Sequence, residues 1–242
     1  MNDSDGSGVK SAERALTILE LFSRPGRALT FTQVAEALGY PRSSLHGLLR
    51  TMTDRGWLRL EPATRRFSLG LRAWEAGVAY APAVDLALSA KPVVEELRGA
   101  VEGSVHVSVL DDGDAVAVIH TGHPSGRRGG AHKAPCGRVL LAHLDRGQVE
   151  RRLAGRLNGD VDELHRALEQ VRDQGWAEGE SRLIEDGRTL AVPVRDRNGE
   201  VVAALGVTAP SATLDGSARE RALGVLRQAA ERLAGQLVPA GA

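Results

Sequence analysis

The chain has 242 residues, and its 31 Lys and Arg balance its 31 Asp and Glu. One cysteine, Cys136, excludes an intramolecular disulfide and a cysteine-rich zinc site. No apolar run is long enough to predict a membrane span and no signal-peptide pattern opens the chain, so we expect a cytoplasmic protein with no membrane partner. The polar, glycine-rich residues 1–8 predict a disordered tail.

The charge is unevenly distributed along the chain. Residues 10–72 hold 11 Lys and Arg against 5 Asp and Glu, a net charge of +6, whereas residues 73–242 carry a net charge of −4. This asymmetry indicates that only the first part meets a polyanion such as DNA. Chance clustering of surface charge is the alternative.

A first helix is predicted over residues 10–22 and is closed by Pro25 and Gly26. A second helix follows with Thr30 or Thr32 as its cap, because a side-chain hydroxyl can accept from the N–H groups that a helix start leaves unpaired. The apolar residues of the first helix recur at helical spacing: Ala12, Ala15, Leu16, Leu19 and Phe22.

Residues 31–50, FTQVAEALGYPRSSLHGLLR, predict two short helices joined by a tight turn. Gly39 falls where the turn requires a positive φ, and Ala35 falls where the two helices would cross. Pro41 suits the first turn of the later helix, where its missing N–H costs nothing. The apolar anchors are Val34, Leu38, Leu45, Leu48 and Leu49. The pattern is typical of a helix-turn-helix that places its second helix in the DNA major groove.

A two-stranded ribbon is expected after Gly56, because WLRLEP and RRFSLG flank a turn at residues 62–64. Three helices and a ribbon predict a winged helix-turn-helix over residues 9–70. A linker helix is predicted over residues 71–82, which are rich in alanine and other apolar residues.

The side chains expected to face DNA are polar or cationic and lie on the outward faces of this domain. Arg42 and Arg50 can form charge-assisted hydrogen bonds with phosphate or a guanine edge, whereas serines at a helix start can also serve only as caps. Arg65 and Arg66, at the ribbon tip, are placed to reach phosphates, with a solvated turn as the alternative. The candidate DNA-binding residues are Lys10, Ser11, Thr32, Arg42, Ser43, Ser44, His46, Arg50, Arg65 and Arg66.

Residues 83–242 predict a second domain of the α+β class. A helix is expected at VVEELRGAV, with Pro92 in its first turns or at a kink. Two hairpins are expected: SVHVSVL and AVAVIHT turn at Asp112–Gly113, and LAVPVRDRNGEVVAALGVT turns at Asn198–Gly199. Further helices are expected over 160–174 and 215–237. Antiparallel strands with helices to one side predict a sensor-like domain.

From Val9 to Leu237 the chain resembles the IclR-type transcriptional regulators. The motifs that carry the resemblance are VKSAERALTILELF, PRSSLHGLLRTM, RFSLG, AHKAPCGRVLLAHL, QGWAEGESRLIEDGRTLAVPV and NGEVVAALGVTAP. The resemblance implies an N-terminal DNA-binding domain, a linker helix and a C-terminal GAF-like domain that binds a small effector. It also implies homodimers, often paired into tetramers, that act on double-stranded DNA operators.

Several residues depart from the family pattern. Gly47 stands where arginine is frequent, which removes one expected phosphate contact. Ala134 stands in place of a frequent threonine, Thr189 in place of a cysteine, and Gly206 in place of a serine. Gly179 falls near a frequent acidic position, with Glu178 and Glu180 on either side. These departures leave the expected fold intact and bear on the effector chemistry.

An effector site is expected where residues 135–138, PCGR, open a helix after a glycine-rich loop. The free N–H groups and partial positive charge of a helix start favour an anion, and an ordinary cap on a surface loop is the alternative. Because Trp176 is the only prominent aromatic residue of this domain, we expect a small polar or anionic metabolite and no stacking pocket. The candidate effector-binding residues are His132, Ala134, Pro135, Cys136, Gly137, Glu180, Thr189, Gly206 and Thr208.

His120, His123 and His132 cluster around the same loop. A metal site there is conceivable, but solvated or core-bonded histidines are commoner, so neither a metal nor a cofactor is expected. Cys136 raises two further hypotheses, a nucleophile with His132 as its base and a redox-sensing thiol whose pKa the helix start lowers. A small apolar side chain lining the pocket is the plainer interpretation, and no catalytic residue is expected.

The sequence therefore predicts a homo-oligomeric DNA-binding transcriptional regulator, not an enzyme, whose operator affinity responds to a small-molecule effector. One alternative is a constitutive DNA-binding protein whose C-terminal domain serves only assembly and holds no ligand. The other is an enzyme that carries a DNA-binding appendage.

Overall fold

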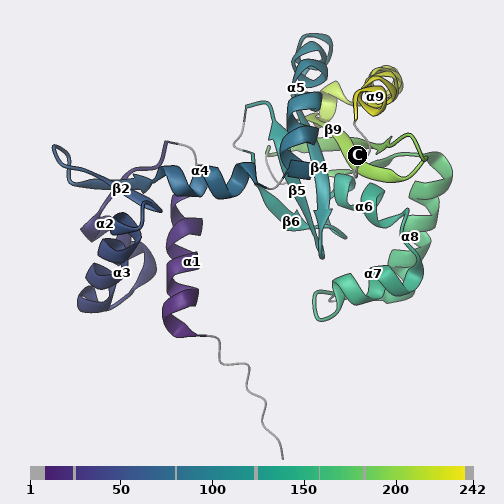
Figure 1. Ribbon diagram of the computed structural model, residues 1–242. Coiled ribbons are helices and arrows are strands. Elements are labelled where there is room, and N and C mark those ends of the chain that lie inside the picture. The colour runs from purple at the N-terminus through teal and green to yellow at the C-terminus, as the bar shows by residue number, and fades with distance from the viewer. Residues whose placement is uncertain are drawn as a thin grey trace, which may run out of the picture. The chain divides into compact units, whose positions relative to one another are not determined.

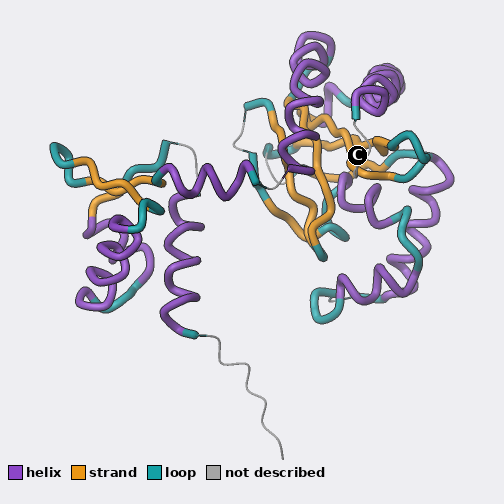
Figure 2. The backbone as a smooth tube through the Cα atoms, in the orientation of Figure 1, coloured by secondary structure: helices purple, strands orange, loops and turns teal. Residues whose placement is uncertain are grey.

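The computed structural model describes residues 9–23, 26–79, 81–122, 125–157, 159–181 and 184–237 (Figure 1, Figure 2). The tail predicted over residues 1–8, together with Pro25 and His123, lies outside the described residues. The chain divides into two compact units, Met1–Tyr80 and Ala81–Ala242, and each is described by itself.

The N-terminal unit holds the predicted helix-turn-helix and wing. Its helices and strands are α1 (Lys10–Phe22), β1 (Leu29–Thr30), α2 (Phe31–Leu38), α3 (Arg42–Asp54), β2 (Leu58–Glu61), β3 (Arg66–Leu69) and α4 (Leu71–Val78). The three strands form an antiparallel sheet in the order β1-β3-β2. The winged helix-turn-helix predicted from the spacing of apolar residues, glycines and prolines is therefore confirmed.

An apolar core holds this unit together, and its buried members are Ile18, Phe22, Val34, Leu45, Leu49, Met52 and Leu58. Of the apolar residues that recur at helical spacing along α1, Leu16 is 60 % exposed, whereas Ile18, which that spacing did not include, is fully buried. Ile18 and Phe22 stand four residues apart and define the buried face of α1. Leu16 lies on the other side of the helix.

The turn of the helix-turn-helix follows the predicted chemistry closely. Of the two candidate caps, Thr30 is the one used, since its hydroxyl accepts from the Gln33 N–H (3.4 Å) and the Gln33 side chain accepts from the Thr30 N–H (2.9 Å). Gly39 ends α2 with φ 64°. Pro41 is the N-cap of α3, one residue earlier than predicted, so its ring directs the chain before the first helical turn begins.

Within the predicted linker, α4 ends at Val78 and a separate helix, α5 (Ala81–Ala100), begins at Ala81. Pro92 lies well inside α5 and not in its first turns. A proline there removes one helical hydrogen bond, the bond to the carbonyl four residues earlier. That carbonyl belongs to Leu88, which is an exposed residue.

The C-terminal unit is built on a six-stranded antiparallel sheet in the order β6-β5-β4-β9-β8-β7. Its strands are β4 (Ser104–Asp111), β5 (Asp114–His120), β6 (Arg128–Gly130), β7 (Ala177–Glu180), β8 (Gly187–Arg195) and β9 (Val201–Pro210). Both predicted hairpins form, with Asp112 at φ 53° in the first turn and Gly199 at φ 85° in the second. The other elements are α6 (Pro135–Leu141), α7 (Arg146–Leu153), α8 (Val161–Gln174), η1 (Ser211–Thr213) and α9 (Gly216–Gln236).

Helices cover both faces of this sheet, so the expectation of helices to one side is wrong (Figure 1). Along β8, Leu190 and Val192 pack with α5 and α9, whereas Ala191 between them packs with α6. Alternate residues of a strand point to opposite faces, and β8 has buried apolar residues on both. In the residues that the structure covers, every helix is too short or too polar to cross a membrane.

Candidate functional site

The first candidate site is the exposed face of α3. Leu45 and Leu49 hold this helix to the core, which leaves Arg42, Ser43 and His46 exposed on its outer side. A helix fixed by one apolar face and free on a polar, cationic face can enter the major groove. The fold therefore places the predicted recognition residues where DNA could reach them.

Several of these side chains also have partners within the protein. The Arg42 guanidinium lies over the Phe31 ring, with Cζ 5.6 Å from its centroid. Ser44 is half-buried, and its hydroxyl donates to the Pro41 carbonyl (3.0 Å). This hydroxyl also accepts from Nη1 of Arg14 (3.5 Å). Ser44 is thus turned towards α1, which sequence reasoning did not foresee.

At the far end of α3, Arg50 pairs with Asp54, with Nε 3.7 Å from Oδ2. Both side chains are exposed, and such a pair contributes little stability. Arg50 can therefore exchange this partner for a phosphate at small cost.

The predicted residues of the wing and of the helix starts are all exposed, and Arg66 also forms a hydrogen bond within the protein. Arg65 is exposed in the β2–β3 turn with φ 54°, whereas Arg66 is the first residue of β3 and donates to the Ala28 carbonyl (3.0 Å). Lys10 and Ser11 are exposed in the first turn of α1. Thr32 is exposed in the first turn of α2.

The second candidate site is a cavity of about 240 Å³ in the C-terminal unit. Six of the nine predicted effector residues line it: Ala134, Pro135, Cys136, Glu180, Thr189 and Thr208. His132, Gly137 and Gly206 are not among its lining residues.

Gly137 and Gly206 do not line the cavity, but the packing around it depends on their lack of a side chain. A Cβ at Gly137 would collide with the carbonyl oxygen of Ala131, so the lack of a side chain lets α6 approach the preceding loop. A Cβ at Gly206 would lie 2.7 Å from Nε2 of His106 and 2.8 Å from Sγ of Cys136. Gly206 thus makes the space that the His106 and Cys136 side chains occupy.

Sequence reasoning did not assign to the site the other residues that line the cavity, which lie on strands or in the adjoining loops: His106, Ser108, Ala115, Ala117, His120, Arg127, Arg128, Gly129, Gly130, Lys133 and Ser181. The alternation of SVHVSVL carried part of the signal, because His106 and Ser108 stand two residues apart and share a face of β4. The contribution of β6 had no such signal, since this strand is only the three residues RGG.

At the floor of the cavity, Sγ of Cys136 lies 3.3 Å from Nε2 of His106. Burial lowers the pKa of His106 to about 3, and the nearby His120 adds to this shift. The two imidazole rings are stacked with centroids 5.2 Å apart. Burial raises the pKa of the Cys136 thiol to about 12. The pair is therefore a neutral imidazole and a neutral thiol near pH 7.

The pKa of the Cys136 thiol bears on both hypotheses about this residue. A helix start was expected to lower the thiol pKa, but desolvation dominates and raises it. The Cys136 thiol contacts Nε2 of His106 and also hydrogen-bonds with the Ser108 side chain. A protonated thiol is a poor nucleophile and resists oxidation, so the arrangement fits a lining group better than a reactive one.

Hydroxyl groups and cations complete the site. Thr189 and Thr208 face each other across β8 and β9, with their hydroxyl oxygens 2.8 Å apart and buried. Arg127 and Lys133 are exposed lining residues. Arg128 also lines the cavity but is paired with Asp111 and Asp114. Hydroxyls inside and guanidinium and ammonium groups outside can hold a small anion. Among the described residues, no three His, Cys, Asp or Glu side chains converge as a metal site would need.

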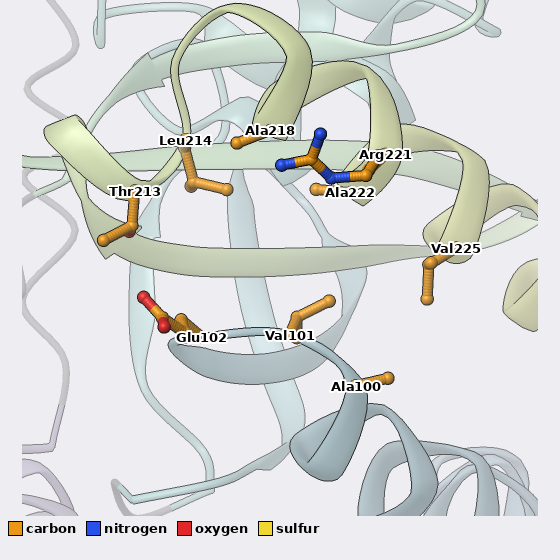
Figure 3. Close-up of a pocket in the computed structure, with 9 residues that line it drawn as sticks. All are labelled: Ala100, Val101, Glu102, Thr213, Leu214, Ala218, Arg221, Ala222 and Val225. Atoms are coloured by element: carbon orange, nitrogen blue, oxygen red, sulfur yellow. The ribbon is translucent and has the colours of Figure 1, made fainter.

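A larger hollow of about 450 Å³ lies between the end of α5 and the start of α9 (Figure 3). Val101, Leu214 and Val225 give it apolar walls, and the charged Glu102 and Arg221 side chains are exposed. None of the predicted effector residues lines it. Its walls lack the buried hydroxyl and imidazole groups of the smaller cavity, which is therefore the better candidate for an effector site.

Two family models together match most of the chain. The family model "Bacterial transcriptional regulator IclR C-terminal" matches residues 78–234, and the model "IclR helix-turn-helix domain" matches residues 11–62. The HTH-type transcriptional regulator KdgR of Escherichia coli is 28 % identical, covering 97 % of this chain and 95 % of KdgR. The glycerol operon regulatory protein of Streptomyces griseus is 29 % identical, covering 84 % of this chain and 85 % of that protein.

Two solved structures are similar over nearly the whole chain. A transcriptional regulator of this type from Alicyclobacillus acidocaldarius superposes with a TM-score of 0.67 at 26 % identity, covering 95 % of this chain and 99 % of that one. A homologue from Microbacterium hydrocarbonoxydans, solved in complex with 4-hydroxybenzoate, superposes with a TM-score of 0.77 at 23 % identity, covering 94 % and 98 %.

Proposed function

The chain belongs to the IclR family of bacterial transcriptional regulators, and on this premise we propose that it is a sequence-specific DNA-binding protein whose operator affinity a small effector changes. Residues 9–70 would bind DNA, residues 71–82 would connect the two parts, and residues 83–242 would bind the effector and assemble the oligomer. The protein would act on chromosomal DNA in the cytoplasm.

The observation that carries the DNA half of the proposal is the exposed cationic face of α3. Arg42, Ser43, His46 and Arg50 would read base edges, because they project from the helix that this fold offers to the major groove. The other predicted residues, including the half-buried Ser44, would contact the sugar-phosphate backbone or orient such contacts. These further residues are Lys10, Ser11, Thr32, Ser44, Arg65 and Arg66.

An exposed apolar face on α4 supports the expected homo-oligomer. On α4, Leu71 is 68 % exposed, Trp74 is 65 % exposed and Val78 is 43 % exposed. The spacing of three and four residues puts them on one side of the helix. A tryptophan and two aliphatic side chains left in water are costly to a monomer, and a second copy of this helix would bury them. A twofold dimer would in turn require a partly palindromic operator.

The effector half of the proposal rests on the 240 Å³ cavity. Its volume is below the roughly 300–1,000 Å³ that is typical of pockets for drug-sized ligands, so the effector would be small. Arg127 and Lys133 favour a carboxylate at the exposed end, and the Thr189–Thr208 hydroxyl pair favours a hydrogen-bonding group inside. The bound 4-hydroxybenzoate of the Microbacterium homologue is a small acid with these two features.

The test is a binding measurement with and without ligand. The full-length protein would first select a duplex from a random-sequence pool, and the affinity for that duplex would then be measured with a panel of small carboxylic acids that includes 4-hydroxybenzoate. We expect at least one acid to change the affinity about 5- to 150-fold, the usual range of allosteric coupling. Unchanged affinity across the panel would favour a constitutive DNA-binding protein with a ligand-free assembly domain.

A further inference from the structure

Two aromatic rings flank the beginning of the recognition helix α3. Phe31 is the first residue of α2, and Tyr40 lies in the turn that leads into α3. Both are half-buried and pack against the buried core of the N-terminal unit. Each ring is therefore anchored on one side and offers its remaining surface to polar neighbours.

The Phe31 ring contacts two side chains of the recognition face at once. Cζ of Arg42 lies 5.6 Å from the ring centroid, which is within the range of a cation–π interaction. The His46 ring lies 6.2 Å away, centroid to centroid, and is tilted by 56°. Arg42 and His46 are four residues apart and share a face of α3. One ring thus restricts both side chains.

The Tyr40 ring does the same for a residue of another helix. Cζ of Arg14, on α1, lies 4.9 Å from the Tyr40 centroid, and Nη1 of Arg14 donates to Oγ of Ser44 (3.5 Å). A guanidinium from α1 is therefore fixed beside the first turn of α3. In helix-turn-helix complexes the first turn of this helix contacts base edges, so a cation beside it adjoins the DNA backbone.

We propose that Phe31 and Tyr40 are positioning residues for DNA binding, and that Arg14 is an additional contact to DNA phosphate. This inference rests on the proposed function, because it assumes that α3 enters the groove. A long cationic side chain loses conformational freedom when it binds, which weakens the complex. A ring that already holds the guanidinium reduces this loss. Phe31 would act through Arg42 and His46, and Tyr40 would act through Arg14.

The experiment compares ring-removing and ring-keeping variants of the full-length protein on the duplex that the wild type selects from a random pool. Phe31→Leu and Tyr40→Leu should each weaken binding about two- to fivefold, the effect of one exposed cation–π interaction. Phe31→Tyr and Tyr40→Phe keep the rings and should stay within about twofold of the wild type. Arg14→Ala should weaken binding and reduce the slope of log affinity against log salt by about one.

A double-mutant cycle separates positioning from mere structural support. Tyr40→Leu should have no further effect in an Arg14→Ala background, and Phe31→Leu should have none in an Arg42→Ala, His46→Ala background. If each leucine variant weakens binding equally in both backgrounds, or leaves wild-type binding unchanged, the inference is overturned. A wild-type protein that prefers no duplex would instead overturn the proposed function, so the two failures are distinguishable.

Discussion

The exposed face of α3 and the 240 Å³ cavity of the C-terminal unit present their functional groups in opposite ways. On α3 the cations are exposed and their ion pairs are weak, as Arg50 and Asp54 show. In the cavity His106, Cys136, Thr189 and Thr208 are buried. Exposed cations bind through their charge, so we expect DNA affinity to depend on the salt concentration. Substitutions of these residues should change the stability of the fold little. Buried neutral groups act through packing and hydrogen bonding, so substitutions of these residues should affect the stability of the fold and the response to ligand together.

The largest expected effect is on the exposed face. The double variant Arg42→Ala, Arg50→Ala should weaken binding to the selected duplex about 100-fold, because each arginine is an expected phosphate or guanine contact. Its unfolding free energy should change by less than about 0.5 kcal/mol, since both side chains are exposed. Fluorescence anisotropy on labelled duplex and urea denaturation check the two parts. Arg98→Ala, an exposed arginine on α5, is the control and should bind as the wild type does.

The next effect belongs to the cavity. Gly206→Ala should lower the unfolding free energy by about 2 kcal/mol, because the new Cβ would press on His106 and Cys136, and it should abolish the effector response. The matched control is Gly47→Ala on α3, where a Cβ meets nothing within 4 Å and should raise helix stability by up to about 1 kcal/mol. Equal unfolding free energies of the two variants would contradict the packing of the cavity floor.

A smaller effect should appear on acidification. The folded-state pKa of His106 is about 3, below its usual 6.5, so the unfolded chain binds more protons between these values. Stability from this group is complete above pH 6.5 and is lost as the pH falls towards 3. Between pH 7 and pH 5.5 the loss should be about 1 kcal/mol, measured by urea denaturation. His106→Gln should flatten this dependence, although His143, whose pKa burial also lowers, will retain part of it.

The smallest effect separates the two wing arginines. Arg65→Ala should weaken binding about two- to fivefold, since Arg65 is exposed in the β2–β3 turn and placed to meet phosphate. Arg66→Ala should weaken binding less, because its guanidinium is held by the Ala28 carbonyl. The salt dependence of binding to the selected duplex measures both. The reverse order would show that Arg66 leaves its intramolecular partner to bind DNA.

The helix-turn-helix and the cavity also differ in how much of each could be predicted from the sequence. The helix-turn-helix is formed by one continuous stretch of sequence, and Thr30, Gly39 and Pro41 mark where its helices begin and end. Its elements could therefore be predicted to within about one residue. The hairpins could be predicted equally well, because Asp112–Gly113 and Asn198–Gly199 are strong turn signals. These signals lie within a few residues of one another, and local chemistry determines them.

The cavity was only partly predictable because distant segments assemble it. Cys136 could be placed at a helix start, but nothing near it in the sequence indicated that His106, 30 residues earlier, contacts its sulfur. The thiol pKa was predicted in the wrong direction for the same reason, since burial depends on packing that the local sequence does not show. The two-sided cover of the sheet did leave a signal that was overlooked, because β8 and β9 carry apolar residues on both faces and such strands are covered on both sides.

The measurement that most directly tests DNA recognition by α3 is a titration of the full-length protein, at moderate salt, against its selected duplex and a scrambled duplex of the same composition. We expect the selected duplex to bind at least about 1,000-fold more tightly, the lower end for specific recognition, and the preference to fall sharply in Arg42→Ala. Equal affinity for both duplexes, or a preference that survives this change at full strength, would contradict the assignment of α3 as the reading element.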